Sequence, residues 1–99
     1  MKLVIRDEAA QDLDDILDWI SPDNPAAAVA LVRRIRKRFD GILSPELAQT
    51  GRPGQDQGTR ELIEYPYVIV YEVDEKADEV IILAVLHGAR DRDRIKPRR

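Results

Sequence analysis

The side chains that could do chemistry in this chain are few. His87 is the only histidine, and the 99 residues include no cysteine. The chain therefore has no disulfides, no thiolate metal ligands and no cysteine nucleophile. A single histidine, with carboxylates scattered along an acidic segment, gives no support for a metal site. We expect no metal and no cofactor.

His87 and two tyrosines need the closest attention. We expect His87 to end a strand with its imidazole bonded to nearby backbone, because no tyrosine or lysine lies beside it in sequence. Tyr67 and Tyr71 share one face of a predicted strand, since alternate residues of a strand point the same way. Both side chains are consistent with packing in the core, where each hydroxyl would reach the edge of that core. They are also candidates for contact with a partner.

Two β-type runs, Tyr67–Asp74 and Glu79–His87, carry these residues and are joined by a polar turn at 75–78. Valine, isoleucine and tyrosine dominate both runs, so they predict a β-hairpin. Strict alternation predicts two faces for the second run, one with Ile81, Leu83, Val85 and His87 and the other with Val80, Ile82, Ala84 and Leu86.

The first half of the chain predicts a strand and two helices that cover the hairpin. Lys2–Arg6 is typical of a short strand, and Asp7 stands where a helix N-cap belongs. An apolar stripe predicts a helix as far as Ser21, with the aspartates, including Asp12, mostly on the opposite side. Asn24 and Pro25 are an N-cap and first-turn pair for the second helix. Its own stripe comprises Ala28, Val32, Ile35, Phe39 and Ile42.

Residues 45–58 are rich in Gly, Pro and Gln, and they predict a loop without regular structure. Thr59–Ile63 predicts a further strand. The order is βααβββ, an α+β fold in which a helix hairpin packs on a small, mostly antiparallel sheet. We expect one domain over residues 1–92, followed by a basic, flexible tail over residues 93–99.

Charge is distributed unevenly along the chain. The net charge of −3 and the pI near 5.1 weigh against a general nucleic-acid binder. Residues 7–23 hold seven acids and no base, whereas residues 90–99 hold six bases and two acids. No apolar run approaches the roughly 20 residues that span a bilayer. We expect a soluble, cytoplasmic protein without membrane contact.

Six pieces, in this order along the chain, resemble the RelE/ParE superfamily of toxins from bacterial type II toxin–antitoxin modules. They are A-x-x-D-L-x-x-I (Ala9, Asp12, Leu13, Ile16), N-P-x-A-A (Asn24, Pro25, Ala27, Ala28), G-R-P-G (Gly51–Gly54), R-E-L-I (Arg60–Ile63), Y-x-I-x-Y-x-V (Tyr67, Ile69, Tyr71, Val73) and I-L-x-V-x-H-G-x-R (Ile82, Leu83, Val85, His87, Gly88, Arg90). The resemblance covers residues 1–92, and the G-R-P-G loop, R-E-L-I and the H-G-x-R ending are closer to the ParE branch.

The resemblance implies two alternative activities. ParE-like members poison DNA gyrase and have no established chemistry of their own, whereas RelE-like members cleave mRNA on the ribosome. RNA cleavage needs a general base, a general acid and cations at one phosphate. Only Arg60, His87 and Arg90 could stand in such places, and no lysine lies between Lys37 and Lys76. We therefore favour a gyrase inhibitor that is not an enzyme, with an mRNA endoribonuclease as the alternative.

The resemblance also implies a cognate antitoxin as partner, bound at an apolar strip or an open sheet edge. A third alternative is a decayed member that retains only antitoxin binding. The basic tail could contribute to the gyrase contact. The candidate partner-binding residues are Arg52, Arg60, Tyr67, Tyr71, Arg90, Arg92 and Arg94.

Overall fold

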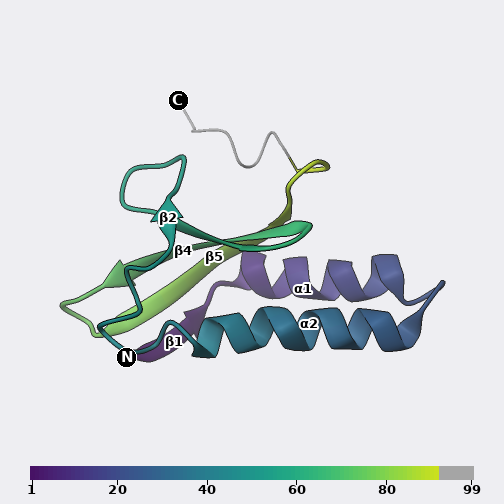
Figure 1. Ribbon diagram of the computed structural model, residues 1–99, viewed down its shortest axis with the longest axis horizontal. Helices are drawn as coiled ribbons and strands as arrows, with labels where there is room; N and C mark the ends of the chain where they lie inside the picture. The colour runs from purple at the N-terminus through teal and green to yellow at the C-terminus, as the bar shows by residue number, and fades with distance from the viewer. Residues whose placement is uncertain (92–99) are drawn as a thin grey trace.

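The computed structural model, which describes residues 1–91, packs two helices against one face of a five-stranded sheet (Figure 1). This arrangement confirms the predicted α+β fold. The predicted loop also contains a short additional strand, β2, which pairs with β3. The elements are β1 (Lys2–Ile5), α1 (Asp7–Ile20), α2 (Pro25–Asp40), β2 (Arg52–Pro53), β3 (Arg60–Glu64), β4 (Tyr67–Asp74) and β5 (Glu79–His87).

The sheet has the order β1-β5-β4-β3-β2. β1 lies parallel to β5, and the other neighbouring strands are antiparallel, as expected of a mostly antiparallel sheet. The predicted hairpin is β4 and β5. Asp78 in its turn has a φ of 56°, a left-handed conformation that aspartate tolerates better than most residues.

A β-bulge in β5 changes the predicted faces of that strand. Val70 pairs with Ala84, but Tyr71 pairs with Ile82, so Leu83 is an extra residue. The prediction of strict alternation is wrong, because one inserted residue reverses the side of everything beyond it. Val85 and His87 therefore face the helices with Val80 and Ile82, whereas the opposite face takes Ile81, Ala84 and Leu86.

The two helices begin differently. The Asn24 side chain accepts a hydrogen bond from Ala27 N at 3.0 Å, and Pro25 is the first residue of α2, which confirms the predicted cap. The prediction of an Asp7 cap is wrong. Arg6 occupies the cap position of α1 without a side-chain bond, and Asp7 lies inside the first turn. A carboxylate there is still favourable, because the N-terminal end of the helix dipole is positive.

Asp12 is buried, although the helical stripe predicted it on the solvent side. Its Oδ2 accepts a hydrogen bond from Val85 N at 2.9 Å. β1 pairs with β5 only as far as Ile82, and the carboxylate supplies an acceptor beyond that point. Asp12 thus joins α1 to the edge of β5, which amphipathic spacing alone does not reveal.

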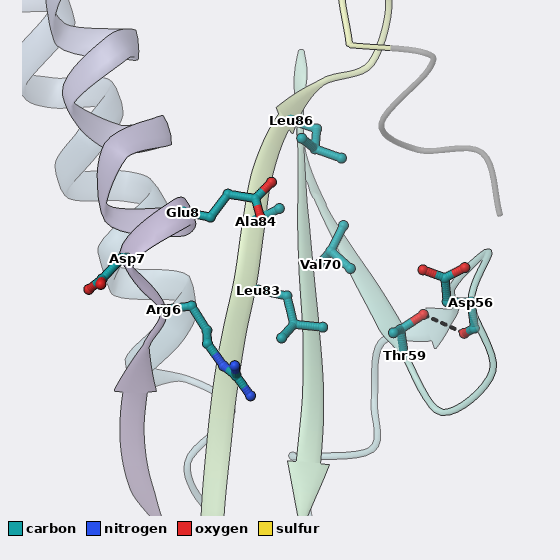
Figure 2. Close-up of a pocket in the computed structure, with 9 residues that line it drawn as sticks. All are labelled: Arg6, Asp7, Glu8, Asp56, Thr59, Val70, Leu83, Ala84 and Leu86. Carbon is teal, nitrogen blue, oxygen red and sulfur yellow. Dashed lines mark hydrogen bonds between the residues drawn. The ribbon is translucent and has the colours of Figure 1, made fainter. Parts of the chain in front are cut away.

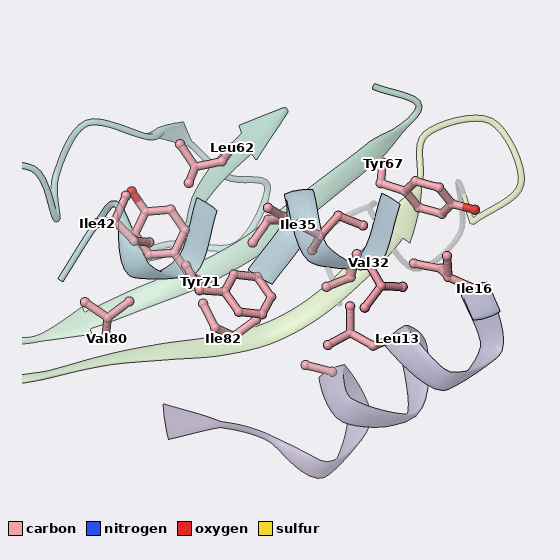
Figure 3. Close-up of a cluster of buried hydrophobic side chains, with 14 of the residues drawn as sticks. Leu13, Ile16, Val32, Ile35, Ile42, Leu62, Tyr67, Tyr71, Val80 and Ile82 are labelled. Atoms are coloured by element: carbon pink, nitrogen blue, oxygen red, sulfur yellow. The ribbon is translucent and has the colours of Figure 1, made fainter. Parts of the chain in front are cut away.

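The core lies between the helices and the sheet (Figure 3). Tyr67 and Tyr71 are part of it, which agrees with their interpretation as packing residues. Among residues 1–91, no helix combines the length and the apolar character needed to cross a bilayer. The most deeply buried large side chains are Tyr71, Phe39, Leu13, Ile35, Ile69, Ile82, Leu86 and Val80.

Candidate functional site

Arg60 begins β3 and binds the loop that follows α2. Its Nε donates to Oε1 of Gln49, and its Nη1 donates to the carbonyl oxygen of Gly51 at 2.8 Å. Two of its donors are therefore engaged within the protein. The main effect of this arginine is to fix the loop.

Tyr71 fixes the same loop from inside. Its hydroxyl accepts from Gly51 N at 3.0 Å and donates to the carbonyl oxygen of Ala48 at 2.9 Å. A Cβ at position 51 would lie 2.5 Å from this hydroxyl, so only glycine fits. We call Arg60, Tyr71 and residues 48–51 the loop clamp.

Arg52 belongs to a third contact. Its Nη2 lies 2.9 Å from Oε1 of Glu61, and its Nε donates to the same oxygen at 3.0 Å. The Glu61 side chain is 4% exposed and that of Arg52 is 60% exposed. Arg52 thus compensates a buried carboxylate and still presents part of its side chain to solvent.

His87 ends β5 and organises the residues after it. Its Nδ1 accepts from the backbone N–H groups of Ala89 and Arg90, at 3.2 and 3.0 Å. The Asp91 carboxylate accepts from His87 N at 2.7 Å. These bonds agree with the expectation that the imidazole binds nearby backbone, whereas the fold also brings Tyr67 to it, with the two ring centroids 5.4 Å apart. We call residues 87–91 the exit turn.

Arg90 connects the exit turn to α1. Its Nη2 donates to the Tyr67 hydroxyl at 3.1 Å, and its Cζ lies 4.6 Å from the centroid of the Trp19 ring. Trp19 is 66% exposed. Sequence reasoning did not single out Trp19, although one exposed tryptophan on an otherwise acidic helix was a usable signal. Exposed aromatic and arginine side chains are typical of binding hot spots.

The three nuclease candidates lie in two separate places. Arg60 pairs with Tyr71, and His87 pairs with Tyr67, so they stand at opposite ends of one stretch of β4. Four residues of strand correspond to about 13 Å. The structure brings His87 and Arg90 together but does not bring Arg60 to them. Arg92 and Arg94 lie outside the described residues.

The sheet face turned away from the helices carries a shallow pocket of about 510 Å³ (Figure 2). Its floor is apolar and comes from Val70, Leu83, Ala84 and Leu86. Three carboxylates and one guanidinium line its sides, together with Thr59. The charged lining residues are Arg6, Asp7, Glu8 and Asp56.

A second hollow, of about 520 Å³, lies between α2 and β3. Leu47, Ile42 and Leu62 form its apolar part. β2 pairs with β3 only at Arg60 and Glu61, so no described strand covers the outer edge of β3 beyond them. The basic side chains that border this hollow are Arg34, Lys37 and Arg38.

Known proteins match this chain over most of its length. A family model described as "ParE toxin of type II toxin-antitoxin system, parDE" matches residues 3–92. The Sinorhizobium fredii protein named "Putative toxin Y4kP" is 38% identical over 82 residues, which cover 81% of this chain and 80% of that protein.

Two solved structures are similar in fold. One is described as "Chromosomal ParDE TA system from P. aeruginosa", with a TM-score of 0.77, 27% identity, and coverage of 88% of this chain and 95% of that chain. The other is the toxin–antitoxin complex RelBE2 from Mycobacterium tuberculosis, with a TM-score of 0.62 and 23% identity. That match covers 87% of this chain and 88% of the other, and its low identity supports the fold alone.

Proposed function

Because this chain belongs to the ParE toxin family of type II toxin–antitoxin systems, we propose that it inhibits DNA gyrase by binding it, without chemistry of its own. The observation that carries this proposal is the engagement of all three nuclease candidates. Arg60 holds a loop, His87 accepts two backbone N–H groups, and Arg90 binds Tyr67 and Trp19. Each side chain already has a structural task.

The electrostatics of the sheet also favour a protein that acts by binding over a nuclease. A nuclease of this fold class needs cations on the sheet to attract RNA phosphates and to stabilise the transition state. The pocket on the open sheet face has more carboxylates than guanidinium groups. Such a surface repels phosphate, so it favours a protein target over mRNA.

The gyrase contact that we propose centres on the exit turn. Arg90 and Trp19 form an exposed cation–π pair there, and exposed pairs of this kind suit a protein interface. Arg52 is a further candidate because most of its side chain is exposed. Arg92 and Arg94, outside the described residues, extend the basic character of this end of the chain.

We also propose that a cognate antitoxin neutralises this toxin. The similar structure at 27% identity is described as a ParDE TA system, which supports such a partner. The hollow between α2 and β3 suits an extended acidic segment. That segment would pair with the open edge of β3, and Arg34, Lys37 and Arg38 would attract its carboxylates.

Two assays run side by side test this function. The purified chain is added to DNA gyrase in a supercoiling assay and to a cell-free translation system with labelled mRNA. We expect supercoiling to stop and the mRNA to remain whole. Cleaved mRNA with unaffected gyrase would contradict the proposal and favour the endoribonuclease. Inactivity in both assays, with antitoxin binding retained, would indicate a decayed member.

A matched pair of surface variants makes the supercoiling assay specific. Trp19→Ala removes the aromatic partner of Arg90, and Val29→Ala removes another exposed apolar side chain, on α2. We expect the first change to weaken inhibition and the second to leave it unchanged. Equal effects of both would argue against the exit turn as the contact surface.

A further inference from the structure

We propose that residues 92–99 of this chain dock on its own sheet, in the pocket on the face opposite the helices. This open face comprises Val68, Val70, Leu83, Ala84 and Leu86. The proposal does not depend on the gyrase target. It rests on the apolar floor of the pocket, the charge around it, and the point where the described chain ends.

The open face is an apolar surface that the helices do not cover. Val68 pairs with Leu86 and Val70 with Ala84 across β4 and β5, which makes a continuous floor. Val70 and Leu83 are only half-buried, and both helices lie on the other side of the sheet (Figures 1 and 2). Their remaining exposed apolar area is stabilised when another segment removes it from water.

Three carboxylates against the one guanidinium of Arg6 line the pocket, and this balance favours a basic occupant. Glu8 at the start of α1 and Asp56 in the loop before β3 stand on opposite sides of the pocket (Figure 2). Residues 92–99, RDRIKPRR, contain five bases, one acid and one large apolar side chain, Ile95. This composition complements an apolar floor between acidic walls.

Residues 92–99 are long enough to reach from Asp91, at the end of the exit turn, to the floor of the pocket. The exit turn ends at Asp91, just beyond Leu86 at one end of the floor. Leu83, at the other end, is three residues further back along β5, or about 10 Å. Ile95 is four residues past Asp91, and an extended chain of that length reaches about 13–14 Å. Ile95 can therefore reach the floor, and the last four residues can reach beyond it.

The tether favours this segment over a free partner. A segment held by a short connection has an effective concentration on the order of millimolar, which an independent peptide does not reach in a cell. In an extended segment alternate side chains point to opposite sides. When Ile95 faces the sheet, some of the neighbouring arginines stay exposed, so docking leaves basic side chains available to a target.

Cysteine crosslinking tests the docking directly, because the chain has no cysteine of its own. Thr59→Cys on the pocket wall is combined with Pro97→Cys, and the full chain is treated with a mild oxidant. The control combines Pro97→Cys with Arg34→Cys, an exposed position on α2. We expect an intramolecular disulfide to form at least about tenfold faster in the Thr59 pair, because of the higher effective concentration.

Three outcomes would overturn the proposal. Equal rates in both pairs would mean that the segment does not prefer the pocket. Disulfides between chains in place of within one chain would assign the pocket to a second copy. An unchanged rate after adding Ile95→Asp would mean that the apolar anchor plays no part.

A second measurement covers the case in which the cysteine variants fold poorly. The methyl NMR signals of Val70 and Leu86 are compared between the full chain and its Ile95→Asp variant. We expect these signals to shift, with those of Val32, on the opposite side of the sheet, unchanged. Identical spectra would contradict docking.

Discussion

Two positions on β4, Tyr67 at its start and Tyr71 in its middle, use the same two residue types for different purposes. At the loop clamp, Tyr71 and Arg60 both bind the backbone of the loop after α2. At the exit turn, Arg90 binds the hydroxyl of Tyr67 and stacks on the exposed ring of Trp19. The first arrangement is closed around buried backbone groups, whereas the second faces the solvent.

This difference shows that surroundings, more than residue type, decide what an arginine–tyrosine pair does. Buried backbone groups lose stability when a partner is removed, because nothing else satisfies them. The exposed Arg90 guanidinium can exchange its partners for water at little cost, so it is free to bind another protein. We therefore expect the loop clamp to govern stability and the exit turn to govern target binding.

Gly51→Ala should have the largest effect on stability. The new Cβ would lie 2.5 Å from the Tyr71 hydroxyl and 2.9 Å from the carbonyl oxygen of Glu61. Overpacking of this kind costs about 1–3 kcal/mol, and we expect the upper end because backbone is involved. Urea unfolding of the purified chain measures it. Gly41→Ala is the control, since its nearest neighbour would lie at 3.5 Å. Equal losses of unfolding free energy in both variants would contradict the claim that the loop clamp governs stability.

Replacing each tyrosine by phenylalanine should give the next largest effect and the sharpest contrast. Tyr71→Phe leaves Gly51 N and the Ala48 carbonyl without their partner, so we expect a loss of about 2 kcal/mol in unfolding free energy. Tyr67→Phe removes only one bond, from Arg90, whose guanidinium can turn to water. We expect at most about 0.5–1 kcal/mol there. The same urea titration compares them, and the reverse order would show that the exit turn carries the stability.

Arg90→Ala should cost no more stability than Tyr71→Phe and should have a clear effect on function. It removes an exposed cation–π contact, which is worth about 0.5–1 kcal/mol, and one hydrogen bond. We expect supercoiling inhibition to weaken markedly in a protein that still unfolds cooperatively. If the variant inhibits gyrase as strongly as the original chain does, the exit turn is not part of the contact with gyrase.

Local sequence signals predicted part of this fold well. Asn24 and Pro25 set the start of α2 because their capping chemistry is contained in two adjacent residues. The hairpin and the binding of the His87 imidazole to nearby backbone followed in the same way from neighbouring residues. Features of this kind need no knowledge of the tertiary fold.

The features that sequence did not reveal depend on tertiary contacts. Nothing near Leu83 marks it as the extra residue of a bulge, since the strand contains no glycine or proline. Asp12 resembles its exposed neighbours until α1 is placed beside the edge of β5. Trp19 becomes part of the candidate site only because Arg90, 71 residues away in sequence, stacks on it.

We propose above all that this toxin acts by binding and that its histidine is structural. His87→Gln tests it most directly, because the glutamine amide oxygen can still accept hydrogen bonds in the exit turn while acid–base catalysis by an imidazole is lost. The variant is assayed for gyrase supercoiling, with unfolding by urea as the check on its fold. We predict that it inhibits gyrase as the original chain does. A stably folded variant without any inhibition would contradict the account.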